Sequence, residues 1–458
     1  MSIKSKYFGN RIFYKRALGI ALPIMLQQLI QSMVSLIDNF MVAGLGDVCM
    51  SGVNVANQVL FVFMIFLNTI CMSGGIYLTQ YFGANDAEGM KQAFRFKVIV
   101  ALLAFIPYFL VCVVFPRQIL SLMLIGNTEA PAILDQGVAY IRLMIFMGLQ
   151  MSISMSIATS LRDTGQVRIP LVVSIVATLT NTFFNWVFIY GNLGAPSLGV
   201  RGAAIATVIA RTVELLIYFA VCSKKRPAFI FMPWKLLKVN KSLFIEIMKK
   251  GAMVLVSEMT WVIAETITTA LYNGRGGADV VSGMAASFAI ANLFFVAFGA
   301  TTAATSVIMG STLGAGKLEE ARKQSKWLLS GGFILGTVMM FVAMGSTLLV
   351  PVVFGRLSTE ATTICRNMIM LMAVFMPVWI YMNVQLAIAR SGGDTAMGAY
   401  ADAFLTVFVM IPLVFLLAIF TDIGPIGLYF YVKIIDIVRI IVFHLWLKRE
   451  RWLRNLAE

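Results

Sequence analysis

Charged residues are scarce in this chain: only 12% of its 458 residues are Asp, Glu, Lys or Arg, whereas 60% are hydrophobic. Soluble globular proteins carry about 25% charged residues, so a surface that faces water throughout is excluded. The stretch 48–81 holds no charge at all, and about 20 apolar residues already suffice to cross a bilayer as a helix. The composition therefore predicts a polytopic helical membrane protein.

Other missing residue types and motifs exclude several classes of function. The chain has one histidine, His444, and five cysteines without metal-type spacing, so we expect no metal, no cofactor and no redox role. No GxxxxGK[ST] loop occurs, so ATP-driven pumping would need a separate subunit. Strict apolar–polar alternation is missing, which excludes a transmembrane barrel. Without a nucleophile motif, an intramembrane enzyme is disfavoured. The first apolar segment is too long for a signal peptide, and we expect it to be retained.

Hydrophobic runs separated by charged or Gly/Pro-rich turns define twelve predicted spans. Counting Lys and Arg at alternating helix ends and connections gives 27 on one side and 5 on the other. The positive-inside rule then places both termini in the cytoplasm. The predicted spans are 17–44, 48–81, 93–115, 132–160, 168–190, 200–222, 251–273, 280–312, 327–353, 362–389, 396–420 and 426–447.

The two halves of the chain repeat each other. The stretch 83-GANDAEGMKQA-93 resembles 314-GAGKLEEARKQ-324, and 161-LRDTGQV-167 resembles 389-ARSGGDT-395, at offsets of 228–231 residues. Six helices in each half make both halves enter from the same side, which predicts two lobes related by a pseudo-two-fold axis along the membrane normal, as in transporters. The expected domains are an N-lobe (1–222), a linker with an amphipathic segment (223–250), a C-lobe (251–447) and a basic cytoplasmic tail (448–458).

A charge at the bilayer centre costs about 2.5–3.5 kcal/mol on insertion scales, so every such residue needs a reason. Asp38 has no opposite charge three or four residues away. Counted along their helices, Asp38, Asn181, Asn185 and Thr207 all fall in the outer half of the membrane. Oxygen ligands of this kind suit Na⁺, and a carboxylate in such a site suits H⁺. The alternative is that these groups only hydrogen-bond helix to helix.

The second half carries different acids. Glu258 and Glu265 are seven residues apart and share a helix face. They are candidates for a substrate cavity or a second cation site, and packing as protonated carboxyls is the alternative. Two charge sets are explained as i,i+3 pairs on single helices, while Arg142 and Asp402 stay undecided. The paired sets are Arg211 with Glu214, and Lys433 with Asp436 and Arg439.

Taken together, four stretches resemble the bacterial multidrug and toxic compound extrusion (MATE) transporters. By motif position, Asp38 matches the family's helix 1 acid, Asn181 a helix 5 asparagine, and Glu258 a helix 7 glutamate that some members use for cation binding. Asn185 stands where members have either an acid or an asparagine. An acid that some members carry on helix 10 is missing here. The stretches are 20-IALPIMLQQLIQSMVSLIDNFMVAGLG-46, 161-LRDTGQVRIP-170, 181-NTFFNWVFIYGNLGAPSLGVRGAAIAT-207 and 314-GAGKLEEARK-323.

The resemblance implies an antiporter of the bacterial inner membrane. It would export amphipathic, often cationic compounds in exchange for H⁺ or Na⁺, with Na⁺ held at Asp38, Asn181 and Asn185. We expect a monomer that binds small molecules and lipid but no nucleic acid. The alternative is a lipid-linked precursor flippase of the same superfamily. Such flippases usually have more helices and a basic cavity, whereas the candidate cavity groups here are acidic or neutral.

Overall fold

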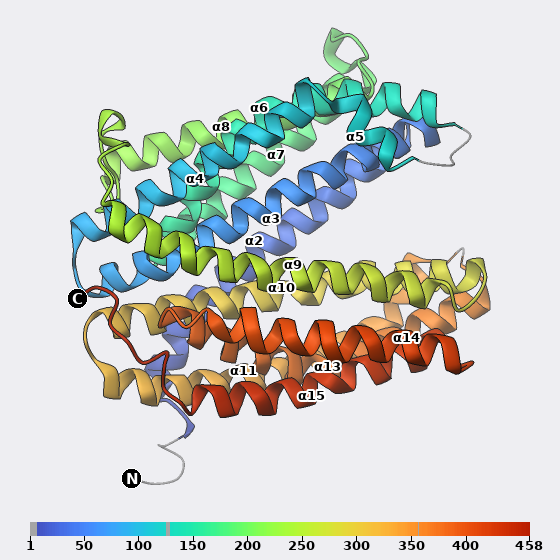
Figure 1. The fold of residues 1–458 in the computed structure, drawn as a ribbon. Coiled ribbons are helices and arrows are strands. Elements are labelled where there is room, and N and C mark those ends of the chain that lie inside the picture. Colours follow the sequence, from blue (N-terminus) through green and yellow to red (C-terminus); the bar gives the residue numbers. More distant parts are fainter. Residues whose placement is uncertain (1–6, 125–128, 356) are drawn as a thin grey trace. The chain divides into compact units, whose positions relative to one another are not determined.

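The computed structural model describes residues 7–124, 129–355 and 357–458, and these ranges contain helices, turns and loops but no strand. Figure 1 shows long helices joined by short connections. In hydrocarbon every backbone N–H and C=O must be paired within the protein, and a helix does this inside one segment. The apolar composition therefore leads directly to the observed all-helical fold.

The chain forms two compact units. Unit 1 comprises the described residues up to Met25, then Thr79–Asp86 and Met248–Glu458, and unit 2 comprises Leu26–Leu78 and Ala87–Ile247. From Arg11 to Lys225 the α-helices are α2 (Arg11–Ala43), α3 (Asp47–Gly83), α4 (Ala87–Val113), α5 (Pro116–Leu122), α6 (Ala130–Asp163), α7 (Arg168–Tyr190) and α8 (Val200–Lys225).

The rest of the chain continues with α9, which begins in the last residues of unit 2 and runs into unit 1. Its helices are α9 (Lys241–Asn273), α10 (Ala278–Gly314), α11 (Leu318–Ser346), α12 (Val350–Val353), α13 (Thr359–Ser391), the π-helices η4 (Met397–Asp402) and η5 (Leu405–Met410), α14 (Ile411–Phe420) and α15 (Pro425–Leu447).

The fold class predicted from the sequence is confirmed: the chain is an all-helical membrane protein, and its described residues form twelve long helical segments, six in each half. Among the described residues, eleven helical segments are long and apolar enough to cross a membrane. The twelfth predicted span coincides with α15, which is not among the eleven. Lys433, Asp436 and Arg439 lie in the middle of α15 and reduce its apolar character.

Two elements differ in detail from the prediction. α9 begins at Lys241, ten residues before the predicted start at residue 251. The lysine pair Lys249–Lys250 suggested a boundary there, but lysine is a good helix former and its long stem keeps the charge near the membrane surface. The predicted span 396–420 begins with two π-helical segments before it becomes α14.

The repeat extends to the geometry of the turns. After α3, the N–H of Asp86 bonds to the carbonyl of Tyr81 at 2.9 Å, and the residue before it, Asn85, has a φ of 57°. After α10, 231 residues later, the N–H of Lys317 bonds to the carbonyl of Thr312 at 3.2 Å. Gly316 there has a φ of 71°. The two turns are equivalent, so the similarity of their sequences reflects the same backbone conformation.

The ends of α3 and α10, which both belong to unit 1, cross at very close range. A Cβ added to Gly83 would lie 2.1 Å from the carbonyl oxygen of Ser311, and one added to Gly314 would lie 1.9 Å from that of Gln80. Gly83 and Gly314 are themselves 231 residues apart. Only glycine permits backbones to approach this closely, so the crossing explains a glycine in both copies of the repeated motif.

Each unit has its own apolar core. The core of unit 2 gathers side chains from α3, α4, α6 and α8, among them Leu67, Tyr108 and Ile141. The core of unit 1 centres on α10 and α13 and includes Phe294 and Trp379. The polar groups described next lie beside these cores, on helices whose positions the cores fix.

Candidate functional site

Asp38, Asn181, Asn185 and Thr207 lie together in unit 2, on three different helices. Asp38 is on α2, the two asparagines are one turn apart on α7, and Thr207 is on α8. The Asn185 Nδ2 donates to Asp38 Oδ1 at 2.6 Å. Asn181 lies 3.2 Å from both Asn185 and Thr207, measured between hydrogen-bonding atoms. The structure thus brings together all four residues that the sequence grouped by depth.

The orientation of the Asn181 carboxamide determines which groups donate hydrogen bonds to the Asp38 carboxylate. In one orientation its oxygen accepts from Asn185 and its nitrogen donates to Thr207. In the reversed orientation its nitrogen lies 2.8 and 3.1 Å from the two oxygens of Asp38, and its oxygen accepts from the Thr207 hydroxyl at 3.2 Å. We favour the reversed orientation because it places a donor against a carboxylate that can only accept. Asp38 then accepts from both carboxamides.

Asp38 forms no ion pair with another described residue. Within the described ranges, no lysine or arginine nitrogen lies within ion-pair distance of Asp38. Arg211, the basic residue on α8, pairs instead with Glu214 at 2.6 Å, as the sequence predicted. Asn181 and Asn185 are 6% and 2% exposed, so the carboxylate sits against buried amides. An acid with neutral donors and no resident cation can take up a proton or a small cation and release it again.

The acids of the second half are engaged differently. On α9, Glu258 Oε1 lies 2.9 Å from Nη2 of Arg390, and Glu265 Oε2 lies 3.4 Å from Nζ of Lys433. Arg390 is at the end of α13 and Lys433 is on α15. Both glutamates therefore already have a cationic partner on a neighbouring helix. Lys433 also lies over the rings of Tyr429 and Trp379, with Nζ 5.1 and 5.7 Å from their centroids.

One expected pairing is wrong and another is confirmed. Lys433 does not neutralise Asp436 on its own helix; its ion pair is with Glu265, because the side chain reaches across to α9. Arg439 does pair with Asp436, at 3.1 Å. Arg439 also approaches Asp402 to 3.2 Å, which gives the acid left undecided from the sequence a partner on another helix.

These groups form a continuous polar chain through unit 1. Arg390 contacts Ser257 at 3.3 Å as well as Glu258, and Ser257 lies 3.5 Å from Asp402. From Asp402 the chain runs through Arg439 to Asp436, whose second oxygen accepts from the indole nitrogen of Trp379 at 2.8 Å. Buried charges are tolerated when they are paired and hydrogen-bonded in this way. The charged groups of this polar network thus largely neutralise one another, whereas Asp38 has no ion-pair partner among the described residues.

Sequence reasoning missed Arg390 and Lys97, which it counted in connecting segments. Lys97 on α4 is fully buried and lies 2.6 Å from the Asp163 carboxylate at the end of α6. A signal was available for both, since Asp163 and Arg390 belong to the repeated motif at 161–167 and 389–395. A charged residue inside a repeated motif indicates a fixed partner and not only a membrane boundary.

The fold, with eleven described helical segments that are long and apolar enough to cross a membrane, defines the chain as a polytopic membrane protein. The structure superposes on a crystal structure of MATE in complex with MaD3S with a TM-score of 0.84, at 18% identity, over 98% of this chain and 97% of the other. The chain belongs to the MatE family, whose model matches residues 23–187 and 254–416, well over half of the sequence. The two matches begin 231 residues apart, at the offset of the internal repeat.

Curated relatives are distant in sequence. A probable multidrug resistance protein NorM of Thermotoga maritima is 25% identical over 199 residues, which is 43% of this chain and 42% of that protein. A probable multidrug resistance protein YoeA of Bacillus subtilis is 22% identical over 416 residues, 89% of this chain and 87% of that protein. The chain thus spans less than half of the Thermotoga protein and most of the Bacillus one.

Proposed function

We propose that this protein is a secondary antiporter that exports amphipathic, cationic compounds in exchange for H⁺ or Na⁺. The carrying observation is the cluster of Asp38, Asn181, Asn185 and Thr207, an acid held by neutral donors with no resident cation. Because the other membrane-embedded acids of the described chain, such as Glu258 and Glu265, have basic partners, Asp38 is the group best suited to exchange its occupant.

The coupling follows from a difference in affinity between two conformations. A cation that binds Asp38 more tightly when the substrate cavity faces outward shifts the population in that direction and favours release of the drug. A cation with equal affinity for both states shifts nothing. H⁺ would neutralise the carboxylate directly. Na⁺ would need several oxygens, which Asp38, the two carboxamides and Thr207 can supply if the amides turn their oxygens inward.

The proposed location is the bacterial inner membrane, with both termini in the cytoplasm. The asymmetry of 27 against 5 basic residues supports this orientation. In that orientation the basic residues around Lys97 and Arg390 lie toward the cytoplasm, and the Asp38 cluster lies toward the outside. We propose that the protein works as a monomer on small amphipathic molecules.

Everted membrane vesicles test the proposal, because efflux then appears as accumulation of a fluorescent cationic dye inside the vesicle. Dye uptake is driven either by a proton gradient or by a sodium gradient, both high inside. We expect one ion to drive uptake in the wild type, and Asp38→Asn to reduce uptake to the level of vesicles without the protein. Asn39→Ala is the matched control, since Asn39 is the next residue on α2 and is exposed.

Glu258→Gln separates coupling from substrate attraction. If Glu258 attracts cationic substrates, the variant loses transport of a cationic dye by severalfold but transports a neutral substrate nearly as well as the wild type. Equal losses for both substrates would contradict that role. If neither ion drives dye movement although the protein is present in the membrane, the antiporter proposal is contradicted. A lipid-linked precursor flippase is then favoured.

A further inference from the structure

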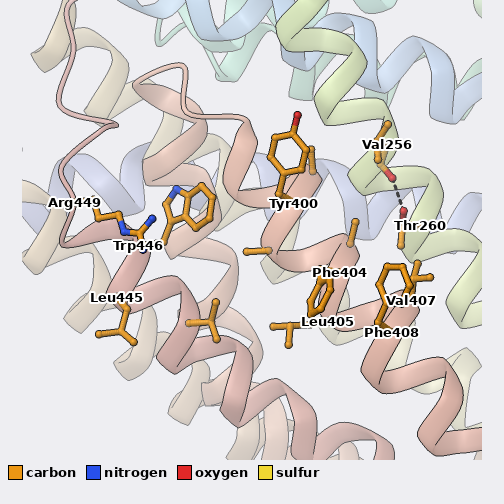
Figure 2. A pocket seen from close by; sticks show the side chains of 14 residues that line it. Val256, Thr260, Tyr400, Phe404, Leu405, Val407, Phe408, Leu445, Trp446 and Arg449 are labelled. Carbon is orange, nitrogen blue, oxygen red and sulfur yellow. Dashed lines mark hydrogen bonds between the residues drawn. The ribbon is translucent and has the colours of Figure 1, made fainter.

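A groove in unit 1 lies outside both polar clusters. It encloses about 860 Å³ between α9, the π-helical segments η4 and η5, and α15 (Figure 2). This volume falls within the range of roughly 300–1,000 Å³ that is usual for small-molecule sites. Its walls are mostly apolar side chains, and its most prominent residues are Val256, Tyr400, Phe404, Phe408, Trp446 and Arg449.

The stretch that holds the two π-helical segments supplies most of the groove's lining. Eight of its fourteen lining residues lie between Ala399 and Phe408. A π-turn holds an additional residue, so it widens the helix and separates side chains that an α-helix would stack, and such segments recur at functional sites. Ala399, Ala401 and Ala403 line the groove and leave room that larger side chains would fill. Asp402, within the same segment, is instead engaged with Arg439.

The large side chains of the groove are open to the surroundings of the protein. Tyr400, Phe404 and Phe408 are 61%, 56% and 66% exposed. In water, an exposed apolar surface of this kind is unfavourable, whereas hydrocarbon chains are a suitable partner for it. This stretch belongs to a segment that is long and apolar enough to span a membrane, so we expect its exposed aromatic side chains to face the acyl region of the bilayer.

One end of the groove is cationic. Arg449 lies two residues beyond the end of α15 and stacks over the Trp446 ring, with the guanidinium carbon 5.6 Å from the ring centroid. Figure 2 shows these two side chains at one end of the groove, and Phe408 and Val407 at the other. Within the described chain no carboxylate forms an ion pair with Arg449. A tryptophan beside an arginine at a helix end is typical of the membrane–water interface.

The depth of the groove also fits a lipid. Val442 and Arg449 both line it and are seven residues apart, so it reaches roughly 10 Å from the interface toward the bilayer middle. An acyl chain attached to a headgroup at Arg449 would run along this length. The charge of Arg449 selects an anionic headgroup over a cationic one, and basic pockets between transmembrane helices bind anionic lipid headgroups in this way.

We propose that this groove is a binding site for an anionic phospholipid of the leaflet that faces the basic tail. The phosphate would lie on Arg449, the glycerol region beside Trp446, and one acyl chain between the π-helical segments and α15. The proposal is independent of the antiporter assignment, because it concerns a surface that none of the proposed coupling residues lines. Under the proposed orientation the leaflet is the cytoplasmic one.

Quenching of Trp446 fluorescence by brominated lipids tests the site in the full-length protein. The chain has seven tryptophans, so the signal of Trp446 is taken as the difference between wild type and Trp446→Phe. The protein is reconstituted in phosphatidylcholine with rising fractions of brominated phosphatidylglycerol or, in parallel, brominated phosphatidylcholine. One basic residue near the surface contributes about 1 kcal/mol, so we expect roughly fivefold selectivity for the anionic lipid.

Two variants separate a built site from general contact with the bilayer. Arg449→Gln should bring the selectivity close to one, while Arg451→Gln, an exposed control outside the groove, should leave most of it. Ala403→Phe, which fills the groove, should reduce quenching by both lipids. Equal quenching by both lipids in the wild type, or selectivity that survives Arg449→Gln, would overturn the proposal. Protection of Trp446 from both lipids would overturn it too, since the groove would then hold something else.

Discussion

Replacing Asp163 by Asn should destabilise unit 2 strongly, because it leaves the Lys97 ammonium without its carboxylate. Lys97 is fully buried, whereas the Asp163 side chain is 17% exposed. The remaining partners of Lys97 are the hydroxyls of Thr159 and Ser160, at 3.3 and 3.2 Å. Removing one member of a buried ion pair costs about 3–5 kcal/mol, and the two hydroxyls place this variant near the lower value.

The same geometry predicts that the two single substitutions lower the stability by different amounts. Lys97→Met leaves a carboxylate that water can reach, so it should cost less, about 1–2 kcal/mol. Combining the two substitutions removes the orphaned charge, and we expect Lys97→Met/Asp163→Asn to be more stable than Asp163→Asn alone. At 2–4 °C per kcal/mol for a domain of this size, the single Asp163→Asn variant should lower the Tm by roughly 6–12 °C.

A thiol-reactive fluorophore measures this unfolding in detergent. Cys71, Cys112 and Cys222 of unit 2 are free and buried, so they react only when the unit opens. The cycle of wild type, two single variants and the double variant gives the coupling between Lys97 and Asp163. A Tm of Asp163→Asn within 2 °C of the wild type, or no recovery in the double variant, would refute the reasoning.

Two further predictions concern the C-terminal tail, which docks on unit 1. The buried Gln80 amide donates to the carbonyls of Ser391 and Arg454, at 2.7 and 3.3 Å, and accepts from the Leu456 N–H at 2.6 Å. Gln80→Ala therefore removes the partner of three backbone groups and should speed tryptic cleavage at Arg454 severalfold; unchanged cleavage would contradict the contact. Hydrogen bonds from Arg322 lower the pKa of Glu450 below its ordinary 4.5. Because the pKa of Glu450 is lower in the folded protein, its contribution to tail docking is complete above the ordinary value of 4.5 and decreases as the pH falls from there to the lower folded value. Glu450→Gln should remove that pH dependence.

The arrangement of helices was accessible from the sequence because the bilayer imposes it. Length and apolarity specify a span, and a charge-free stretch such as 48–81 has no other stable place. The grouping of Asp38 with Asn181, Asn185 and Thr207 was also accessible, since the rise of a helix converts residue number into depth. Its role as a coupling site remains a prediction.

Contacts between helices were less accessible. Lys433 has Asp436 three residues away, yet it pairs with Glu265, because which side chain a long lysine reaches depends on packing that sequence spacing does not contain. Arg390 and Lys97 stood at helix ends, where a basic residue usually meets water, and the structure buries both. Apart from the single glycine Gly398, the stretch 397–410 carries no turn or breaker residue, so an α-helix was the natural expectation.

Binding of the dye to purified protein, measured as a function of pH and of Na⁺, tests the central claim about Asp38 most directly. If substrate and coupling cation exclude each other through Asp38, the cation must weaken dye binding by the same factor by which the dye weakens cation binding, typically 5–150-fold. The account predicts such weakening by H⁺ or by Na⁺ in the wild type and in Asn39→Ala, and its loss in Asp38→Asn. Dye affinity that ignores both ions in the wild type, or a cation effect that persists in Asp38→Asn, would contradict it.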